Sequence, residues 1–97
     1  MTVFAVQYTY DNRTLVRDEV RPAHRAFLSG LSAAGSLLAS GPLAEDAAGV
    51  PGALLIVAAE SADHAATLLD DDPFAHAGLI AARELRAWTQ VYGPWTS

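Results

Sequence analysis

The chain has 97 residues, of which 52% are hydrophobic and 18% are charged. This length fits one domain over residues 1–97, and the apolar content exceeds what so short a chain can easily bury, which predicts a self-association surface. The absence of cysteine excludes disulfides, thiolate nucleophiles and cysteine-ligated metals. A net charge of −5, with six arginines and no lysine, argues against a nucleic-acid partner.

Neither a membrane span nor an export signal is predicted. The longest uncharged run, residues 26–44, contains four serines, three glycines and Pro42, whereas a spanning helix would be more uniformly apolar. The first residues, Met1 to Ala5, lack both a basic stretch and a long apolar stretch. We therefore expect no signal peptide, a cytoplasmic location and no membrane contact.

The first part of the chain predicts a strand followed by a helix. Residues Val3–Tyr10 are β-branched and aromatic and end at a turn signal, which is typical of a strand. Apolar residues then recur at helical spacing from Val20 to Leu31. Pro22 leaves two interpretations, because the helix either starts near this proline or starts near Leu15 and kinks there. Gly35 suits the C-terminal end of the helix.

The middle of the chain predicts two further strands and a second helix. We expect a short strand at Ser36–Leu43, broken by Gly41-Pro42, and then a loop at Ala44–Gly52. An apolar strand is expected at Ala53–Ala59. Ser61 is then placed to cap a second helix, and Pro73 ends it.

The last segment, Leu79–Tyr92, is ambiguous because its first half favours a helix and its second half a strand. If it is a strand, the order is β-α-β-β-α-β, the ferredoxin-like arrangement of an α+β protein with a four-stranded antiparallel sheet. Two helices cover one face of such a sheet, yet the strands at Val3–Tyr10 and Ala53–Ala59 are apolar on both faces. A homodimer packed sheet against sheet would cover the second face.

His24 is the first candidate for chemistry. It lies on the apolar face of the first predicted helix, so its ring should point toward the sheet. One interpretation is a core histidine satisfied by a backbone carbonyl. The other is a general acid or base, because an unperturbed imidazole titrates at about pH 6.5. The pattern alone leaves both open.

Asp72 is the second candidate, at the end of the acidic run Asp70-Asp71-Asp72. We interpret Asp70 and Asp71 as a solvated acidic turn. Asp72 differs because the proline that follows it disfavours helical geometry and redirects its side chain. A carboxylate there could orient His24 and stabilise its imidazolium, although spacing alone does not bring the two residues together.

The remaining polar residues give weaker signals. Arg21 could supply positive charge to an anionic ligand, or it could belong with Arg17 and Arg25 to a solvated stripe at i, i+4 and i+8. His64 is expected in water on a polar face of the second predicted helix, and His76 in water in a loop after Phe74. The sequence has no HExxH spacing, no phosphate-binding glycine loop and no GxSxG elbow. We therefore expect no metal and no cofactor.

A series of short motifs resembles the YCII (YciI-like) family from Phe4 to about Tyr92. In chain order they are Arg21-Pro22-Ala23-His24, Phe27-Leu28 with Leu31, Gly35 to Pro42, Asp72-Pro73-Phe74, Ala77-Gly78-Leu79 and Leu85-Arg86-Ala87-Trp88. The resemblance implies one YCII-like domain over residues 1–97, with a ferredoxin-like fold that pairs into a dimeric α+β barrel. It also implies that the last segment is a strand.

The same resemblance implies a site. The family's recurrent polar pair, a histidine of the first helix and the aspartate of a DP-aromatic motif, falls on His24 and Asp72 and implies a catalytic dyad. The expected substrate-binding residues are Arg21, Ser40, Gly41, Pro42 and Phe74.

The resemblance further implies acid–base chemistry without a cofactor, on a small cyclic or aromatic organic molecule. One related enzyme type is a dehydrochlorinase of a chlorinated hydroxyhydroquinone that uses a His–Asp pair, and isomerases of the muconolactone type belong to the same superfamily. We expect a lyase- or isomerase-type elimination or isomerisation in which His24 moves the proton. The alternative is a non-catalytic homodimer that binds a small molecule or has a structural role.

Overall fold

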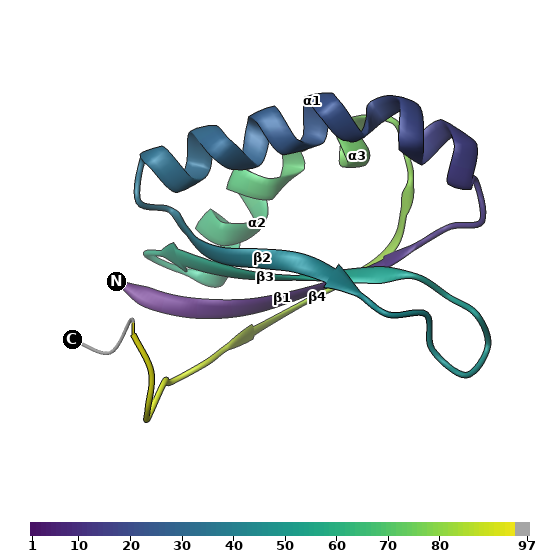
Figure 1. The fold of residues 1–97 in the computed structure, drawn as a ribbon. Coiled ribbons are helices and arrows are strands. Elements are labelled where there is room, and N and C mark those ends of the chain that lie inside the picture. The colour runs from purple at the N-terminus through teal and green to yellow at the C-terminus, as the bar shows by residue number, and fades with distance from the viewer. Residues whose placement is uncertain (95–97) are drawn as a thin grey trace.

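The computed structural model describes residues 1–94. Its elements are β1 (Thr2–Tyr10), α1 (Thr14–Ala33), β2 (Leu37–Leu43), β3 (Gly52–Ala59), α2 (Ala62–Asp70), α3 (Pro73–His76) and β4 (Ile80–Ala87). The strands form one antiparallel sheet in the order β2-β3-β1-β4, and the helices lie together on one of its faces (Figure 1). This confirms the α+β, ferredoxin-like fold expected from the sequence, including a strand in the last segment.

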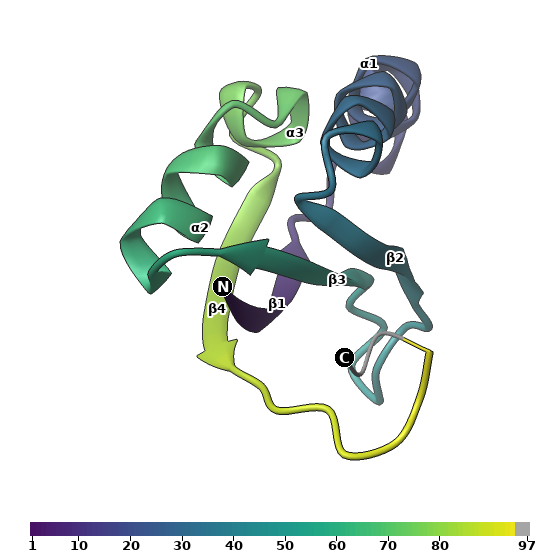
Figure 2. The ribbon, with the colours of Figure 1, turned by 90° about the vertical axis from the view of Figure 1, so that its left-hand side faces the viewer.

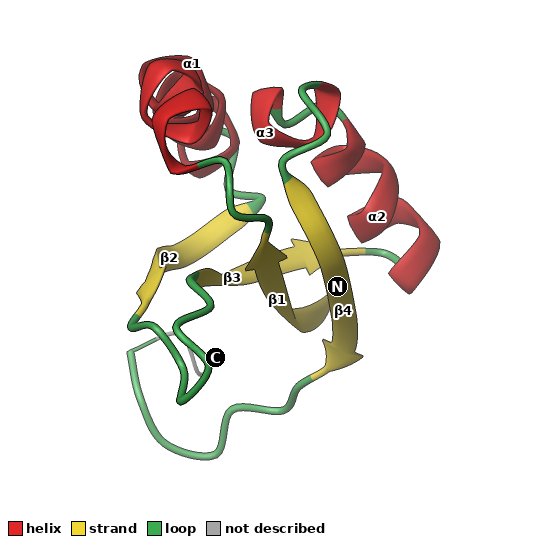
Figure 3. Ribbon diagram, turned by 90° about the vertical axis from the view of Figure 1, so that its right-hand side faces the viewer, coloured by secondary structure: helices red, strands yellow, loops and turns green. Residues whose placement is uncertain are grey.

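The helices divide the sheet between them. Helix α1 lies on the β2 side, whereas α2 and α3 lie on the β4 side, as the views from the two ends of the sheet show (Figures 2 and 3). The segment that follows β4 turns below the sheet, away from the helices (Figure 1). None of the helices described in residues 1–94 is both long and apolar enough to cross a membrane.

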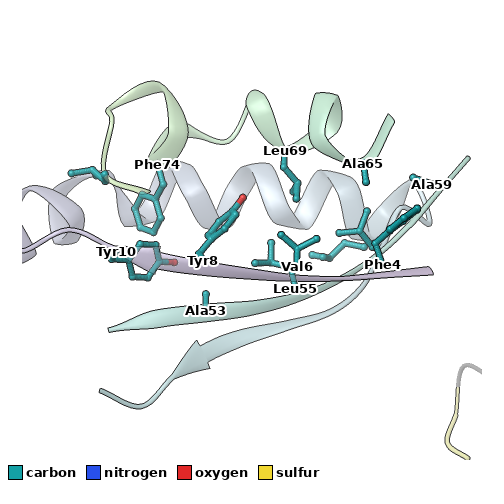
Figure 4. Packing of buried hydrophobic residues seen from close by; sticks show 13 residues of the cluster. Phe4, Val6, Tyr8, Tyr10, Ala53, Leu55, Ala59, Ala65, Leu69 and Phe74 are labelled. Atoms are coloured by element: carbon teal, nitrogen blue, oxygen red, sulfur yellow. The ribbon is translucent and has the colours of Figure 1, made fainter. Parts of the chain in front are cut away.

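The core lies between the sheet and the helices. Because side chains alternate between the faces of a strand, every second residue of β1 points toward the helices, and these buried residues are Phe4, Val6, Tyr8 and Tyr10. Figure 4 shows them beneath Leu69 of α2 and Phe74 of α3. Both of these helix residues are also buried, so one apolar cluster joins the sheet to α2 and α3.

Helix α1 begins at Thr14 and continues through Pro22, so the earlier of the two expected starting points is correct. The proline is exposed, while Arg17 and His24 on either side of it are buried and hold both parts of the helix in the fold. Beyond the helix, Gly35 has a φ of +81°, the left-handed conformation that commonly ends a helix.

Strand β2 corrects one expectation. The strand is not broken at Gly41-Pro42, since it runs from Leu37 to Leu43 and Pro42 pairs with Ala53 of β3. A proline is tolerated here because β2 is an edge strand, where one side of the backbone needs no partner. The irregularity in this pairing lies earlier, as a register shift between Leu37 and Ala39.

The region after α2 also differs in detail from the sequence interpretation. Pro73 does end α2, but it begins the short helix α3, whose last residue is His76. His76 was expected in a loop. Strand β4 ends at Ala87, so Tyr92, which was considered as part of this strand, lies beyond it.

Candidate active site

Asp72 is a buried carboxylate at the start of α3. Its backbone has a φ of −59° and a ψ of 127°, which is outside the helical region, as expected for a residue before a proline. Its Oδ1 atom accepts a hydrogen bond from the backbone N–H of Phe74 at 2.9 Å. Asp72 therefore caps α3, and its side chain is 0% exposed.

Two side chains from other elements also contact this carboxylate. His24 of α1 places Nδ1 at 2.7 Å from Oδ1, and the hydroxyl of Tyr8 donates a hydrogen bond to Oδ2 at 3.0 Å. The structure thus brings His24 and Asp72 together across 48 positions of sequence. Hydrogen bonds from three donors offset the lost hydration of a buried carboxylate.

The contact with Asp72 assigns the roles of the two nitrogens of His24. A carboxylate can only accept, so Nδ1 carries the proton and Nε2 keeps a free lone pair in the neutral ring. Nε2 has no hydrogen-bond partner in residues 1–94, yet no buried side-chain nitrogen or oxygen there lacks one. Nε2 therefore reaches the accessible surface, although the residue as a whole is only 8% exposed.

Aromatic packing holds the imidazole of His24 in place. The ring of His24 stacks on Phe74 with centroids 3.9 Å apart and planes 7° apart. Tyr10 meets the edge of Phe74 at 5.5 Å, and the guanidinium of Arg17 lies 4.9 Å above the Tyr10 ring. Arg17 is 4% exposed, so its place in a solvated arginine stripe is wrong: the first turn of α1 packs this residue against β1 instead.

Burial sets the state of the two tyrosines near the site. Burial, with the charge of Asp72 as the next cause, raises the pKa of Tyr8 far above its ordinary value. The same two causes raise the pKa of Tyr10 to about 12. Both hydroxyls therefore stay protonated at neutral pH, and that of Tyr8 donates to Asp72. That of Tyr10 has no hydrogen-bond partner in the described part of the chain, so like Nε2 of His24 it reaches the accessible surface.

A cavity of about 500 Å³ lies against His24. Its walls come from α1, α3 and the first three strands, and the lining residues are Tyr10, Arg21, His24, Arg25, Leu28, Ser40, Gly41, Pro42, Ala53, Leu55 and Phe74. All five residues expected to bind substrate are therefore placed along this cavity, although their role in binding stays a prediction. Asp72 is not among the lining residues and lies behind the imidazole.

Several lining residues were missed by the sequence interpretation. Tyr10 shares a strand face with core residues, and no signal in the sequence distinguishes it from them. Arg25 follows Arg21 by one helical turn, so the spacing of the two arginines could have indicated it. Arg21 itself is ion-paired with Asp18, which precedes it by three positions on α1.

The other polar candidates lie apart from the cavity. His64 accepts a hydrogen bond from the backbone N–H of Glu60 at 3.1 Å and is exposed. His76 is also exposed, with Nε2 at 3.7 Å from Asp71. Within residues 1–94, no three His, Asp or Glu side chains gather into a group that could hold a metal ion.

Comparisons with known proteins show the family to which the chain belongs. The chain matches the YCII-related domain over residues 1–89, and no curated protein gives a significant match. A similar solved structure is the 5-chloro-2-hydroxyhydroquinone dehydrochlorinase (TftG) from Burkholderia phenoliruptrix AC1100, in complex with 2,5-dihydroxybenzoquinone. Its sequence is 31% identical to this one, the match covers 90% of this chain and 93% of the dehydrochlorinase chain, and the two structures superpose with a TM-score of 0.75. The chain belongs to the YCII-related domain family.

Proposed function

We propose that the protein is an acid–base enzyme that needs no cofactor and acts on a small cyclic or aromatic organic molecule by elimination or isomerisation. The observation that carries this proposal is the arrangement of His24, whose Nδ1 lies 2.7 Å from the buried Asp72 carboxylate while its Nε2 has no partner among residues 1–94. The similarity to a dehydrochlorinase supports a dehydrochlorinase-like elimination as the specific reaction.

In this proposal Nε2 of His24 is the general base. It removes a proton from the substrate, the electron pair of the broken bond forms the new double bond, and the leaving group departs with its own bonding electrons. Isomerisation shares the first step and returns the proton to a different carbon. In both reactions Asp72 stabilises the positive charge that forms on the imidazole and keeps the ring in its reactive tautomer.

Charge that develops on the substrate would be met by donors along the cavity. The hydroxyl of Tyr10, with its pKa raised to about 12, can donate a hydrogen bond without losing its proton. Arg21 of α1 also lines the cavity, although its charge is shared with Asp18. Donors that are already in place when negative charge appears lower the barrier, because they need no rearrangement during the reaction.

The walls of the cavity favour a flat and largely apolar ligand. Phe74, Leu28 and Leu55 line it, and the stacking of His24 on Phe74 holds the imidazole plane in one orientation. Ser40, Gly41 and Pro42 form the β2 side of the cavity, where we propose that they bind the substrate.

We also propose that two copies of the chain pair through the open face of the sheet. Leu54 of β3 and Leu43 of β2 are 39% and 36% exposed there. Together with Trp88, they line a mostly apolar hollow of about 530 Å³. Apolar side chains on the uncovered face of an antiparallel sheet indicate that the face is covered in the assembled protein.

The test is a ligand screen followed by product analysis. Wild type, His24→Gln and the control His64→Gln are screened by thermal shift against small phenols, quinols, lactones and keto acids, and each hit is analysed for product. We expect His24→Gln to reduce turnover by about 10²- to 10⁴-fold, the usual contribution of a general base, and His64→Gln to leave it unchanged. Equal turnover by His24→Gln and wild type would contradict the proposal, whereas tight binding of an unaltered compound would favour the non-catalytic alternative.

A further inference from the structure

We propose that the ligand of the His24 cavity is an organic acid whose anionic group is bound by Arg25, where this cavity meets a second hollow lined by serines. The inference rests on the proposed function, because it takes the cavity as the substrate site. It adds the charge of the substrate and the residue that selects for it.

The second hollow adjoins the first along the groove between α1 and β2. It has a volume of about 280 Å³, and Arg25, Leu28 and Ser40 line both hollows. A ligand ring seated against His24 could therefore carry a substituent that extends past Leu28 into the second hollow. Arg25 stands at the junction that such a substituent would cross.

The charge around this junction is positive. Among residues 1–94, no aspartate or glutamate lines either hollow, although the chain as a whole has a net charge of −5. Of the two arginines present, Arg21 is ion-paired with Asp18. Arg25 has no acidic partner in the described part of the chain. A guanidinium only donates hydrogen bonds and suits the planar geometry of a carboxylate, so an uncompensated arginine here favours an anion.

Hydroxyl groups continue the same surface beyond Arg25. Ser29 and Ser32 follow it on α1, and Ser40 faces them from β2 across the hollow. Ser29 lies four positions after Arg25 and so shares its helix face. None of the three hydroxyls has a hydrogen-bond partner among residues 1–94, so all are available to donate to an anionic oxygen.

The experiment compares ligand pairs that differ only in charge. Benzoate and phenylacetate are titrated against benzamide and phenylacetamide, with binding read as chemical-shift changes of backbone amides along α1 and β2. The proteins are wild type, Arg25→Gln, Arg25→Lys and Arg86→Gln. Arg86 is the control because it is exposed and lies on β4 outside both hollows.

We expect wild type to prefer each carboxylate over its amide by about tenfold, the lower range for a hydrogen bond to a charged group. Arg25→Gln should lose this preference, Arg25→Lys should retain part of it, and Arg86→Gln should behave as wild type. A wild type without a preference for the carboxylates, or an Arg25→Gln variant that keeps it, overturns the inference. Binding is measured without turnover, so carboxylate selection at Arg25 can hold even if His24 proves not to be a base. Equally, His24 can prove to be a base even if Arg25 does not select carboxylates.

Discussion

Replacing Asp72 with alanine removes the acceptor that three donors share. Tyr8 and Phe74 are 0% and 1% exposed as residues, so the hydroxyl of the first and the backbone N–H of the second would both stay buried without a partner. His24 is a smaller loss, because its ring reaches the accessible surface and can move its proton to the other nitrogen. The main cost of the substitution therefore falls on the first two donors.

The magnitude follows from those two donors. A buried donor left without an acceptor costs about 1–3 kcal/mol, so the two together give a loss of roughly 2–6 kcal/mol in the free energy of unfolding. Domains of this size are stable by roughly 5–15 kcal/mol in total. Asp72→Asn should cost less than Asp72→Ala, because its amide oxygen can serve His24 and Phe74 while the hydroxyl of Tyr8 turns to accept from the amide nitrogen.

Urea unfolding followed by far-ultraviolet circular dichroism measures these differences. All variants are compared at one protein concentration, since self-association would make the apparent stability depend on concentration. The matched control is Asp71→Ala, because the Asp71 side chain is 80% exposed and its loss should change stability by no more than about 0.5 kcal/mol. If Asp72→Ala were no less stable than Asp71→Ala, the hydrogen-bonded carboxylate would not have the role assigned to it.

Three further predictions concern the tyrosine at the cavity, the packing of the sheet and its open face. Because the pKa of Tyr10 is raised to about 12 in the folded chain and is about 10 in an unfolded one, this tyrosine should lower stability by up to about 1.4 kcal/mol per pH unit as pH rises from about 10 to 12. Tyr8, whose pKa is also raised, adds a fall of its own, so Tyr10→Phe should show a shallower fall, not a flat line, in urea unfolding across that range. Gly52→Ala would place a Cβ 2.4 Å from a backbone oxygen of β1 and should cost about 1–3 kcal/mol. Gly30→Ala in helix α1, where no atom of the described residues lies within 4 Å of the new Cβ, should be neutral or stabilising in the same assay. Leu54→Glu should shift the chain toward monomer in sedimentation, while Leu15→Glu on α1, where the side chain is 79% exposed, should not; equal behaviour of the two variants would contradict pairing through the sheet.

Local signals were sufficient for several elements of the fold. The expected cap at Ser61 is present, with its hydroxyl accepting from the backbone N–H of His64 at 3.0 Å, and Gly35 ends α1 as expected. These features depend on a few neighbouring residues, so the sequence contains all the information needed. The interpretation of Gly41-Pro42 as a break failed because whether a proline is tolerated depends on the position of the strand in the sheet, which no local pattern shows.

The site could be predicted only in part, because its contacts join distant segments. The helical pattern placed His24 on the inner face of α1, and Pro73 indicated that the side chain of Asp72 would be redirected. Neither pattern could pair the two residues, and the expectation that they form a dyad came from the family resemblance. The contact of Tyr8 with Asp72 was missed, since alternation in β1 marks Tyr8 as a core residue and says nothing of what its hydroxyl meets.

Exchange with deuterium oxide shows whether His24 moves a substrate proton. A ligand found in the screen is incubated in deuterium oxide with wild type, His24→Gln or His64→Gln, and deuterium in the recovered ligand and its product is measured by mass spectrometry. We expect incorporation or turnover with wild type and with His64→Gln, and rates about 10²- to 10⁴-fold lower with His24→Gln. Deuterium incorporation or turnover by His24→Gln at the wild-type rate would show that His24 is not the base.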